Sequence, residues 1–149
     1  MRLNRDLHEF VELLNSRKVD YLVVGAHALA FHGHPRYTGD LDLLVRPAVD
    51  NARRVIAVLH AFGFGSLGLA EDDFVQPDHI IQLGYPPNRI DLLTSISGVS
   101  FDEAWQSREN GMLDEIPVHY IGRKTLVRNK LASGRLKDAA DVEALGESS

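Results

Sequence analysis

One short apolar run, YLVVG at 21–25, constrains the fold more than any other stretch of this sequence. Its residues are apolar at successive positions, so a strand made from them is expected to be covered on both faces. Such a strand belongs in the middle of a sheet that has helices over it. Gly25 ends the run, and AHALAFHG at 26–33 is predicted to form two helical turns closed by Gly33.

A second strand is predicted at 40–46, after a loop at 34–39 in which Pro35 prevents the helix from continuing. Because side chains alternate along a strand, Asp40 and Asp42 point the same way, about 6.6 to 6.8 Å apart at the backbone. Both carboxylates can therefore converge on one ion, and hard cations such as Mg²⁺ prefer carboxylate and phosphate oxygens. The alternative is a half-exposed strand with a solvated acidic face.

Asp91 adds a third carboxylate on a later strand. The segments 79–84 and 89–95 are predicted to form a hairpin joined by the turn YPPN. If the second of these strands neighbours the strand at 40–46, the three carboxylates meet on one surface, where mutual repulsion would raise their pKa values. Two bound metal ions would neutralise such a cluster. The alternative is that Asp91 pairs with Arg89 or another base.

Three residues upstream of the carboxylates are candidates for phosphate binding. Gly25, between a buried strand and a helix, lets backbone approach a phosphate, and the helix N-terminus favours the anion. Arg36 offers a charged fork and Thr38 a hydroxyl for triphosphate oxygens. The alternatives are a plain strand-to-helix turn at Gly25 and ordinary loop positions for the other two.

Taken together, these motifs resemble the polymerase-β-like nucleotidyltransferase superfamily. Gly25-Ala26 is followed by thirteen residues and then by Asp40-Leu41-Asp42, with Asp91 on a later strand. The resemblance covers roughly the first two thirds of the chain. The wider string also contains Ala28, His32-Gly33, Arg36 and Thr38, and it is similar to a small prokaryotic branch that includes minimal nucleotidyltransferases and toxin–antitoxin relatives.

The resemblance implies metal-dependent transfer of a nucleoside monophosphate from an NTP to an acceptor hydroxyl, with release of pyrophosphate. Asp40 and Asp42 would hold the metal ions, Mg²⁺ or Mn²⁺. Asp91 would bind the second ion and help to deprotonate the acceptor. The acceptor itself, an RNA end, a protein or a small molecule, is left open.

On the phosphate side, the resemblance implies that Gly25 and the backbone after it, beginning with Ala26, cradle the β and γ phosphates. Many active members of the superfamily have a serine where this chain has Ala26. Backbone donors can substitute for that hydroxyl. A second hypothesis therefore stands beside the enzyme: a catalytically silent relative that acts as a binding partner, for example in a toxin–antitoxin pair.

The remaining segments complete the expectation of one α+β domain over 1–149, with a mixed sheet flanked by helices. A strand is predicted at 116–122, where Pro117 suggests an edge position. Helices are predicted at 2–17, 49–62, 101–107 (capped by Ser100), 123–132 and 136–145. The segment 63–77 has no clear assignment.

The two C-terminal helices contain a local basic cluster, Lys124, Arg128, Lys130, Arg135 and Lys137. It could approach a triphosphate or an acceptor RNA. The favoured interpretation is helices with solvated faces, in which Lys137 pairs with Asp141 four residues later.

The composition limits which partners, metal ligands and cellular location are expected for this protein. The formal net charge of −5 argues against broad binding to nucleic acid. Cysteine is absent, so any metal must use oxygen or imidazole ligands. No apolar run is long enough for a membrane span, and the N-terminal residues MRLNRDLHEF lack the apolar core of a signal peptide. A cytoplasmic protein is therefore expected.

Overall fold

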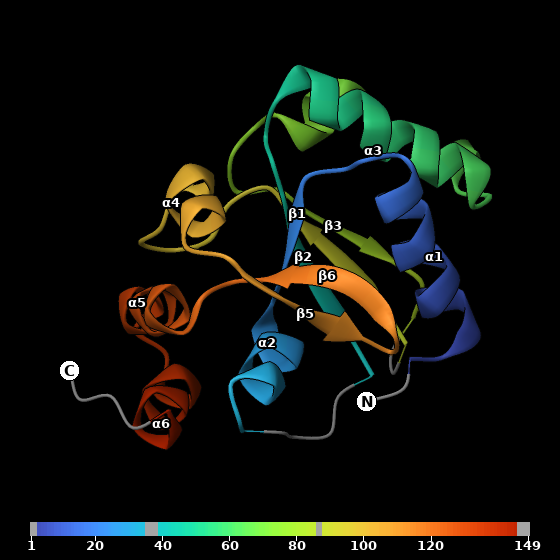
Figure 1. The fold of residues 1–149 in the computed structure, drawn as a ribbon. Helices are drawn as coiled ribbons and strands as arrows, with labels where there is room; N and C mark the ends of the chain where they lie inside the picture. Colours follow the sequence, from blue (N-terminus) through green and yellow to red (C-terminus); the bar gives the residue numbers. More distant parts are fainter. Residues whose placement is uncertain (1–2, 35–38, 86–87, 146–149) are drawn as a thin grey trace.

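Six strands form one mixed sheet in the computed structural model, which describes residues 3–34, 39–85 and 88–145 (Figure 1). The strand order is β3-β4-β2-β1-β6-β5. The pairs β1–β2, β3–β4 and β5–β6 are antiparallel, whereas β1–β6 and β2–β4 are parallel. The strands are β1 (Tyr21–Val24), β2 (Leu41–Val45), β3 (Ile80–Leu83), β4 (Ile90–Leu93), β5 (Glu109–Leu113) and β6 (Ile116–Tyr120).

Helices cover the sheet, as the sequence predicted for an α+β fold. In Figure 1, α1 and α3 lie side by side on one side of the sheet, and α4, α5 and α6 lie on the other. None of the described helices is long and apolar enough to cross a membrane. The α-helices are α1 (Arg5–Ser16), α2 (Gly25–Phe31), α3 (Val49–Ala61), α4 (Phe101–Gln106), α5 (Arg123–Ser133) and α6 (Leu136–Ala144).

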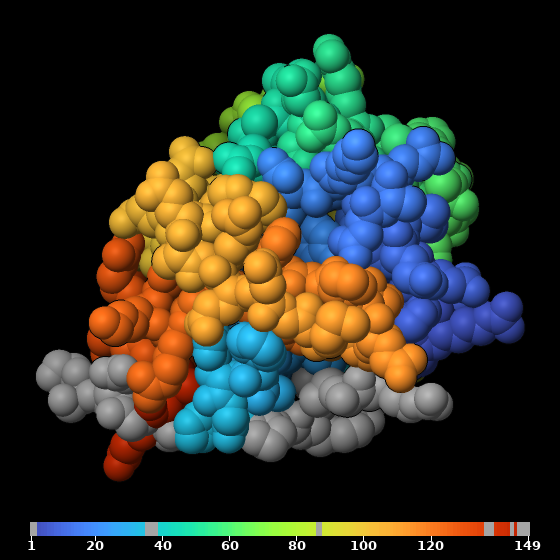
Figure 2. All heavy atoms as spheres, viewed as in Figure 1, coloured from blue at the N-terminus to red at the C-terminus, as the bar shows by residue number. Residues whose placement is uncertain are grey.

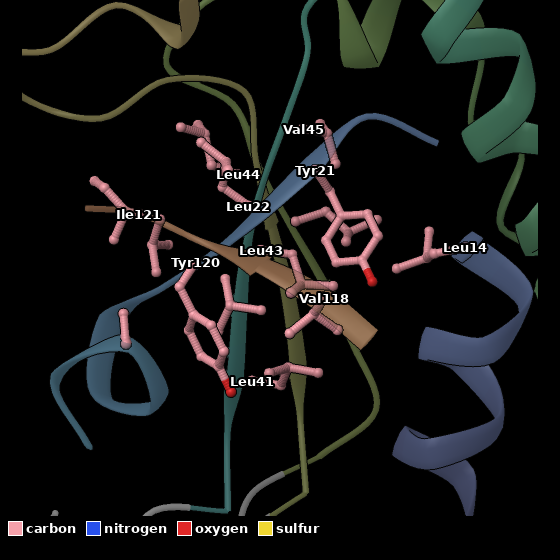
Figure 3. Close-up of a cluster of buried hydrophobic side chains, with 14 of the residues drawn as sticks. Leu14, Tyr21, Leu22, Leu41, Leu43, Leu44, Val45, Val118, Tyr120 and Ile121 are labelled. Atoms are coloured by element: carbon pink, nitrogen blue, oxygen red, sulfur yellow. The ribbon is translucent and has the colours of Figure 1, made fainter. Parts of the chain in front are cut away.

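The central position predicted for the run at 21–25 is confirmed. All four residues of β1 are buried, and the strand lies between β2 and β6. Figure 3 shows Tyr21 of β1 beside Leu14, which α1 contributes to the core. The hydroxyl of Tyr21 donates a hydrogen bond to Asn15 Oδ1 at 2.7 Å, so this buried phenol keeps a polar partner.

Local signals explain where two of the helices begin. Asn4 caps α1 by accepting a hydrogen bond from the Leu7 N–H at 2.9 Å. Ser100 caps α4 through a capping box, in which its hydroxyl accepts from the Glu103 N–H and the Glu103 carboxylate accepts from the Ser100 N–H. The cap predicted at Ser100 is therefore confirmed.

The edge position predicted for the strand with Pro117 is wrong. β6 lies inside the sheet, and the edge is formed by β5, a strand that the sequence pattern did not indicate. Pro117 is tolerated there because the register with β1 pairs only Tyr120 with Val23, so no hydrogen bond to β1 is needed at the proline. Figure 2 shows the β5–β6 hairpin (orange) at the molecular surface, between the region of α4 (gold) and that of α2 (cyan).

The segment at 63–77 contains two short 3₁₀ helices, η1 (Gly65–Leu67) and η2 (Glu71–Phe74). Phe74 of η2 is fully buried, and both turns contact α3. Neither turn is long enough to produce a hydrophobic period, which explains why the sequence pattern left this segment unassigned.

Candidate functional site

A cavity of about 610 Å³ lies between the sheet and α5. Its volume is within the range of small-molecule sites in proteins. The sheet side and the segment after β4 contribute one wall, and α5 and the turn after it contribute the other. The lining residues are Val24, Gly25, Asp42, Asp78, Ile80, Asp91, Leu93, Ser95, Ile96, Ser97, Asn129, Lys130, Ser133 and Arg135.

Asp42 and Asp91 meet on the sheet wall because of the strand register. β2 and β4 are parallel neighbours, and Asp42 lies directly opposite Asp91. On the other side of β2, Asp42 lies opposite Val24 at the end of β1. Since directly opposite residues point to the same face of a sheet, both carboxyl groups project into the cavity.

The site concentrates negative charge where water only partly reaches it. Asp91 is 8% exposed and Asp42 is half-buried. Burial, and then the charges of Asp91 and Asp40, raise the pKa of the Asp42 carboxyl to about 6, although Arg89 acts in the opposite direction. Burial is the largest cause of this shift and the like charges add to it, and a bound cation would offset both.

Arg89 supplies compensating positive charge. Its Nε donates to Asp91 Oδ1 at 2.7 Å and its Nη2 to Asp91 Oδ2 at 3.0 Å, a two-pronged pair. The hydrogen bond to Asp91 raises the pKa of Arg89. The pairing of Asp91 with Arg89, one of the alternatives that the sequence left open, is therefore confirmed. The same carboxylate nevertheless stays beside Asp42 and on the cavity wall.

Asp40 joins the cluster through its contacts with Arg89. Its Oδ1 accepts the backbone N–H of Arg89 at 3.2 Å, and its Oδ2 lies 3.5 Å from Nη2 of the same residue. It precedes β2 and is not among the described residues that line the cavity. In the described part of the chain, no three acidic or imidazole side chains are grouped to hold one metal ion.

Gly25 leaves space for the carboxylate of Asp42. The glycine has φ +67°, a conformation that favours a residue without Cβ, and a Cβ there would clash with Oδ2 of Asp42. Gly25 lines the cavity, and Ala26, which follows it in α2, is half-buried. Arg36 and Thr38, the other residues predicted to bind phosphate, lie outside the described residues.

On the wall formed by α5 and the turn after it, Lys130 and Arg135 belong to the basic cluster that could approach a triphosphate, whereas Asn129 and Ser133 were not recognised from the sequence. Asn129 and Ser133 line the cavity, and the Asn129 side chain donates to the Ser97 carbonyl at 3.0 Å, which ties α5 to the segment after β4. No pattern in the sequence predicts which strand a polar side chain on a helix will face. The contribution of Asn129 and Ser133 to the cavity therefore depends on how α5 packs on the sheet.

Two members of the basic cluster take structural roles. Lys130 is buried and pairs with Asp141 of α6 at 2.9 Å, so the partner of Asp141 comes from the preceding helix. Arg128 pairs with Glu103 of α4 at 2.6 Å. The side chain of Lys137, the partner that the sequence predicted for Asp141, lies outside the described part of the chain.

Comparison with protein-family models and with curated proteins found no match. Comparison with solved structures found eight matching chains, among them three that resemble nearly the whole chain. A candidate nucleotidyltransferase from Thermotoga maritima superposes with a TM-score of 0.62 at 15% identity, over 96% of this chain and 94% of that one. The lincosamide antibiotic adenylyltransferase LnuA, solved with lincomycin bound, gives 0.55 at 12% identity, over 96% of each chain.

The third is an antigenic nucleotidyltransferase-like protein from Paracoccidioides brasiliensis, with a TM-score of 0.54 at 20% identity over 94% of this chain and 72% of that one. At these identities the likeness concerns the fold, and it agrees with the motifs found in the sequence. The chain therefore has the fold of the nucleotidyltransferase superfamily that its Gly25-Ala26 and Asp40-Leu41-Asp42 motifs resemble.

Proposed function

We propose that this protein transfers a nucleoside monophosphate from an NTP to an acceptor hydroxyl in the cavity between the sheet and α5. The observation that carries the proposal is the pair Asp42 and Asp91, which lie opposite each other on parallel strands and line that cavity. The fold shared with nucleotidyltransferases supports it. A cytoplasmic location, where NTP and Mg²⁺ are abundant, is part of the proposal.

The residues present fit a divalent cation. Mg²⁺ is commonly bound in proteins by one or two carboxylates together with substrate phosphates. Asp42 and Asp91 supply two carboxylates on one wall, and the pKa of Asp42 is raised first by burial and then by its acidic neighbours. By the resemblance, Asp40 and Asp42 would hold the metal ions and Asp91 would bind the second one, although Asp40 is not among the described residues that line the cavity. When bound, the cation supplies neutralisation of charge that develops on the phosphates.

The chain's own residues would bind and orient the NTP and the acceptor, and one of them would accept a proton. The acceptor oxygen forms a bond to the α-phosphorus while the bond from that phosphorus to the leaving pyrophosphate breaks. The proton of the acceptor hydroxyl passes to a carboxylate oxygen, a role that we assign to Asp91. The backbone at Gly25 and Ala26, with Arg36 and Thr38, would contact the β and γ phosphates.

The acceptor is proposed as a hydroxyl of a small molecule, a protein or an RNA end. LnuA is described as an antibiotic adenylyltransferase, which makes a small-molecule acceptor the first class to screen. The net charge of −5 argues against a long nucleic acid as the acceptor.

The experiment is incubation of the protein with Mg²⁺ or Mn²⁺, each of the four labelled NTPs, and panels of the three acceptor classes. Asp42→Asn should lose transfer by at least about 10²-fold, because the cation loses a ligand on the cavity wall. Asp72→Asn is the matched control: Asp72 is exposed, accepts a hydrogen bond from Gln76 and does not line the cavity, so transfer should be unchanged. Equal activity of Asp42→Asn and wild type would contradict the proposal.

One observation favours the second candidate, a catalytically silent protein that acts as a binding partner, for example in a toxin–antitoxin pair. Both oxygens of Asp91 already accept hydrogen bonds from Arg89. A protein that binds no NTP in the presence of Mg²⁺ or Mn²⁺, measured by equilibrium dialysis with labelled nucleotide, would support this candidate over the enzyme.

A further inference from the structure

Arg89 connects two of the three carboxylates of the site. Its guanidinium donates to both oxygens of Asp91, at 2.7 and 3.0 Å, and lies 3.5 Å from Oδ2 of Asp40. Its backbone N–H also donates to Oδ1 of Asp40 at 3.2 Å. A single residue therefore supplies a positive charge and three hydrogen bonds to the group that would hold a metal ion.

Asp91 keeps lone pairs with which it can coordinate a cation, but the positive charge of Arg89 opposes the binding of that cation. A carboxylate has about four lone-pair positions, so two hydrogen bonds from Arg89 do not fill the coordination capacity of Asp91. The guanidinium stays protonated at any pH a protein meets. Its charge is held against Asp91, which is buried, so water screens it less from an ion bound at the same carboxylate than it would at the surface.

We propose that Arg89 is an intrinsic counter-cation that weakens the binding of a free divalent ion, so that the metal enters the site together with the NTP. This inference rests on the proposed function, because it assumes that the carboxylates are metal ligands. Within the group formed by these three carboxylates and Arg89, the formal charge is −3 from the carboxylates and +1 from the guanidinium, a sum of −2. A triphosphate brings further negative charge and so offsets the repulsion between Arg89 and the metal.

A different role for Arg89 predicts the opposite change in metal affinity when the residue is replaced. If its hydrogen bonds only orient Asp91 for coordination, removing them leaves a less ordered ligand and weakens metal binding. If its charge competes with the metal, removing it strengthens binding. The sign of the change in affinity therefore separates a competing cation from a positioning residue.

In the experiment, Mn²⁺ is titrated without nucleotide into wild type and Arg89→Gln. The concentration of free Mn²⁺ is measured by electron paramagnetic resonance. Arg89→Gln should bind Mn²⁺ about tenfold more tightly than wild type. Equal or weaker binding would overturn the inference, as would the absence of binding by both proteins up to millimolar Mn²⁺. Arg53→Gln is the matched control, because Arg53 is an exposed arginine paired with Glu71 at 3.0 Å and does not line the cavity. Its affinity for Mn²⁺ should equal that of wild type.

A second measurement covers the effect of the substitution on folding. In a chelator, Arg89→Gln should melt at a lower temperature than wild type, since the carboxylates lose their counter-charge, and Mn²⁺ should raise its Tm by more than it raises that of wild type. If Arg89→Gln does not fold, Arg89→Lys is the second variant. It keeps the charge and loses the paired donors, so its Mn²⁺ affinity should stay close to that of wild type. Clearly weaker binding by Arg89→Lys would overturn the inference, because it would show that the donors of Arg89 position Asp91 for the metal.

The outcome is distinguishable from that of the proposed function. Transfer by wild type together with an Mn²⁺ affinity that does not respond to Arg89→Gln would contradict only the inference. Tighter Mn²⁺ binding by Arg89→Gln in a protein that transfers no nucleotide would support the inference and contradict the enzyme.

Discussion

The carboxylate of Asp42 lies against the Cα of Gly25, at a point where a Cβ on the glycine would clash with Oδ2 of the aspartate. Asp42 lies on β2, and Gly25 begins α2 directly after Val24, the β1 residue that pairs with Asp42. The glycine that the sequence assigned to phosphate contact therefore has a second role, because it leaves space for a candidate metal ligand.

Gly25→Ala should destabilise the protein through both its conformation and this contact. A residue with Cβ at φ +67° costs about 1 to 2 kcal/mol, and displacing Asp42 should add at least about 1 kcal/mol. Gly68→Ala separates the two effects, because Gly68 has φ +70° and a Cβ there meets nothing within 4 Å. Urea unfolding of both variants measures the difference; equal losses would show that the contact with Asp42 contributes nothing.

Asp42→Asn should stabilise the metal-free protein while it removes transfer. Burial and then the charges of Asp91 and Asp40 raise the pKa of Asp42 to about 6, so its ionised form at neutral pH is unfavourable in the folded state. An amide at this position should raise the free energy of unfolding by about 1 to 3 kcal/mol. The measurement is urea unfolding in a chelator at pH 7.5. A loss of stability would show that the attraction between Asp42 and Arg89 outweighs the repulsion.

Lys130→Met should destabilise the protein strongly, because it removes a cation from the buried carboxylate of Asp141. The side chains of Lys130 and Asp141 are only 9% and 4% exposed, and breaking such a pair typically costs about 3 to 5 kcal/mol. The double variant Lys130→Met/Asp141→Leu should recover part of this loss. Arg5→Ala breaks an exposed pair with Glu9 and should cost less than about 1 kcal/mol in the same unfolding assay. Similar losses for the two single variants would contradict the prediction.

Glu103 should make stability depend on pH in the acid range. Hydrogen bonds, first from the Ser100 backbone and then from Arg128, lower the pKa of Glu103 from 4.5 to about 2. The folded state therefore binds this proton less readily than the unfolded state. The stabilisation is fully present above pH 4.5 and is lost as the pH falls toward 2. Melting temperatures of wild type and Glu103→Gln between pH 7 and pH 2.5 measure the effect. The variant should show a shallower decline, and parallel curves would contradict this assignment.

Much of the fold was predictable because its signals are local. The run at 21–25 is apolar on both faces, and burial of such a run requires a central strand whatever the rest of the chain does. The Ser100 cap and the amphipathic period of the first helix likewise depend on residues a few positions apart. The edge strand β5 escaped prediction because ENGML at 109–113 is largely exposed and carries no alternating pattern.

For the site, the sequence by itself determined which carboxylates are available and that Asp42 belongs to a buried strand after a glycine turn. Only the tertiary structure decided that Asp42 and Asp91 lie opposite each other, because the register of two parallel strands far apart in the chain is set by packing. It also placed Arg89 between Asp91 and Asp40 and brought Asn129 and Ser133 to the facing wall. The sign of each charge is set by the residue type, whereas the distance between charges depends on how the whole chain packs.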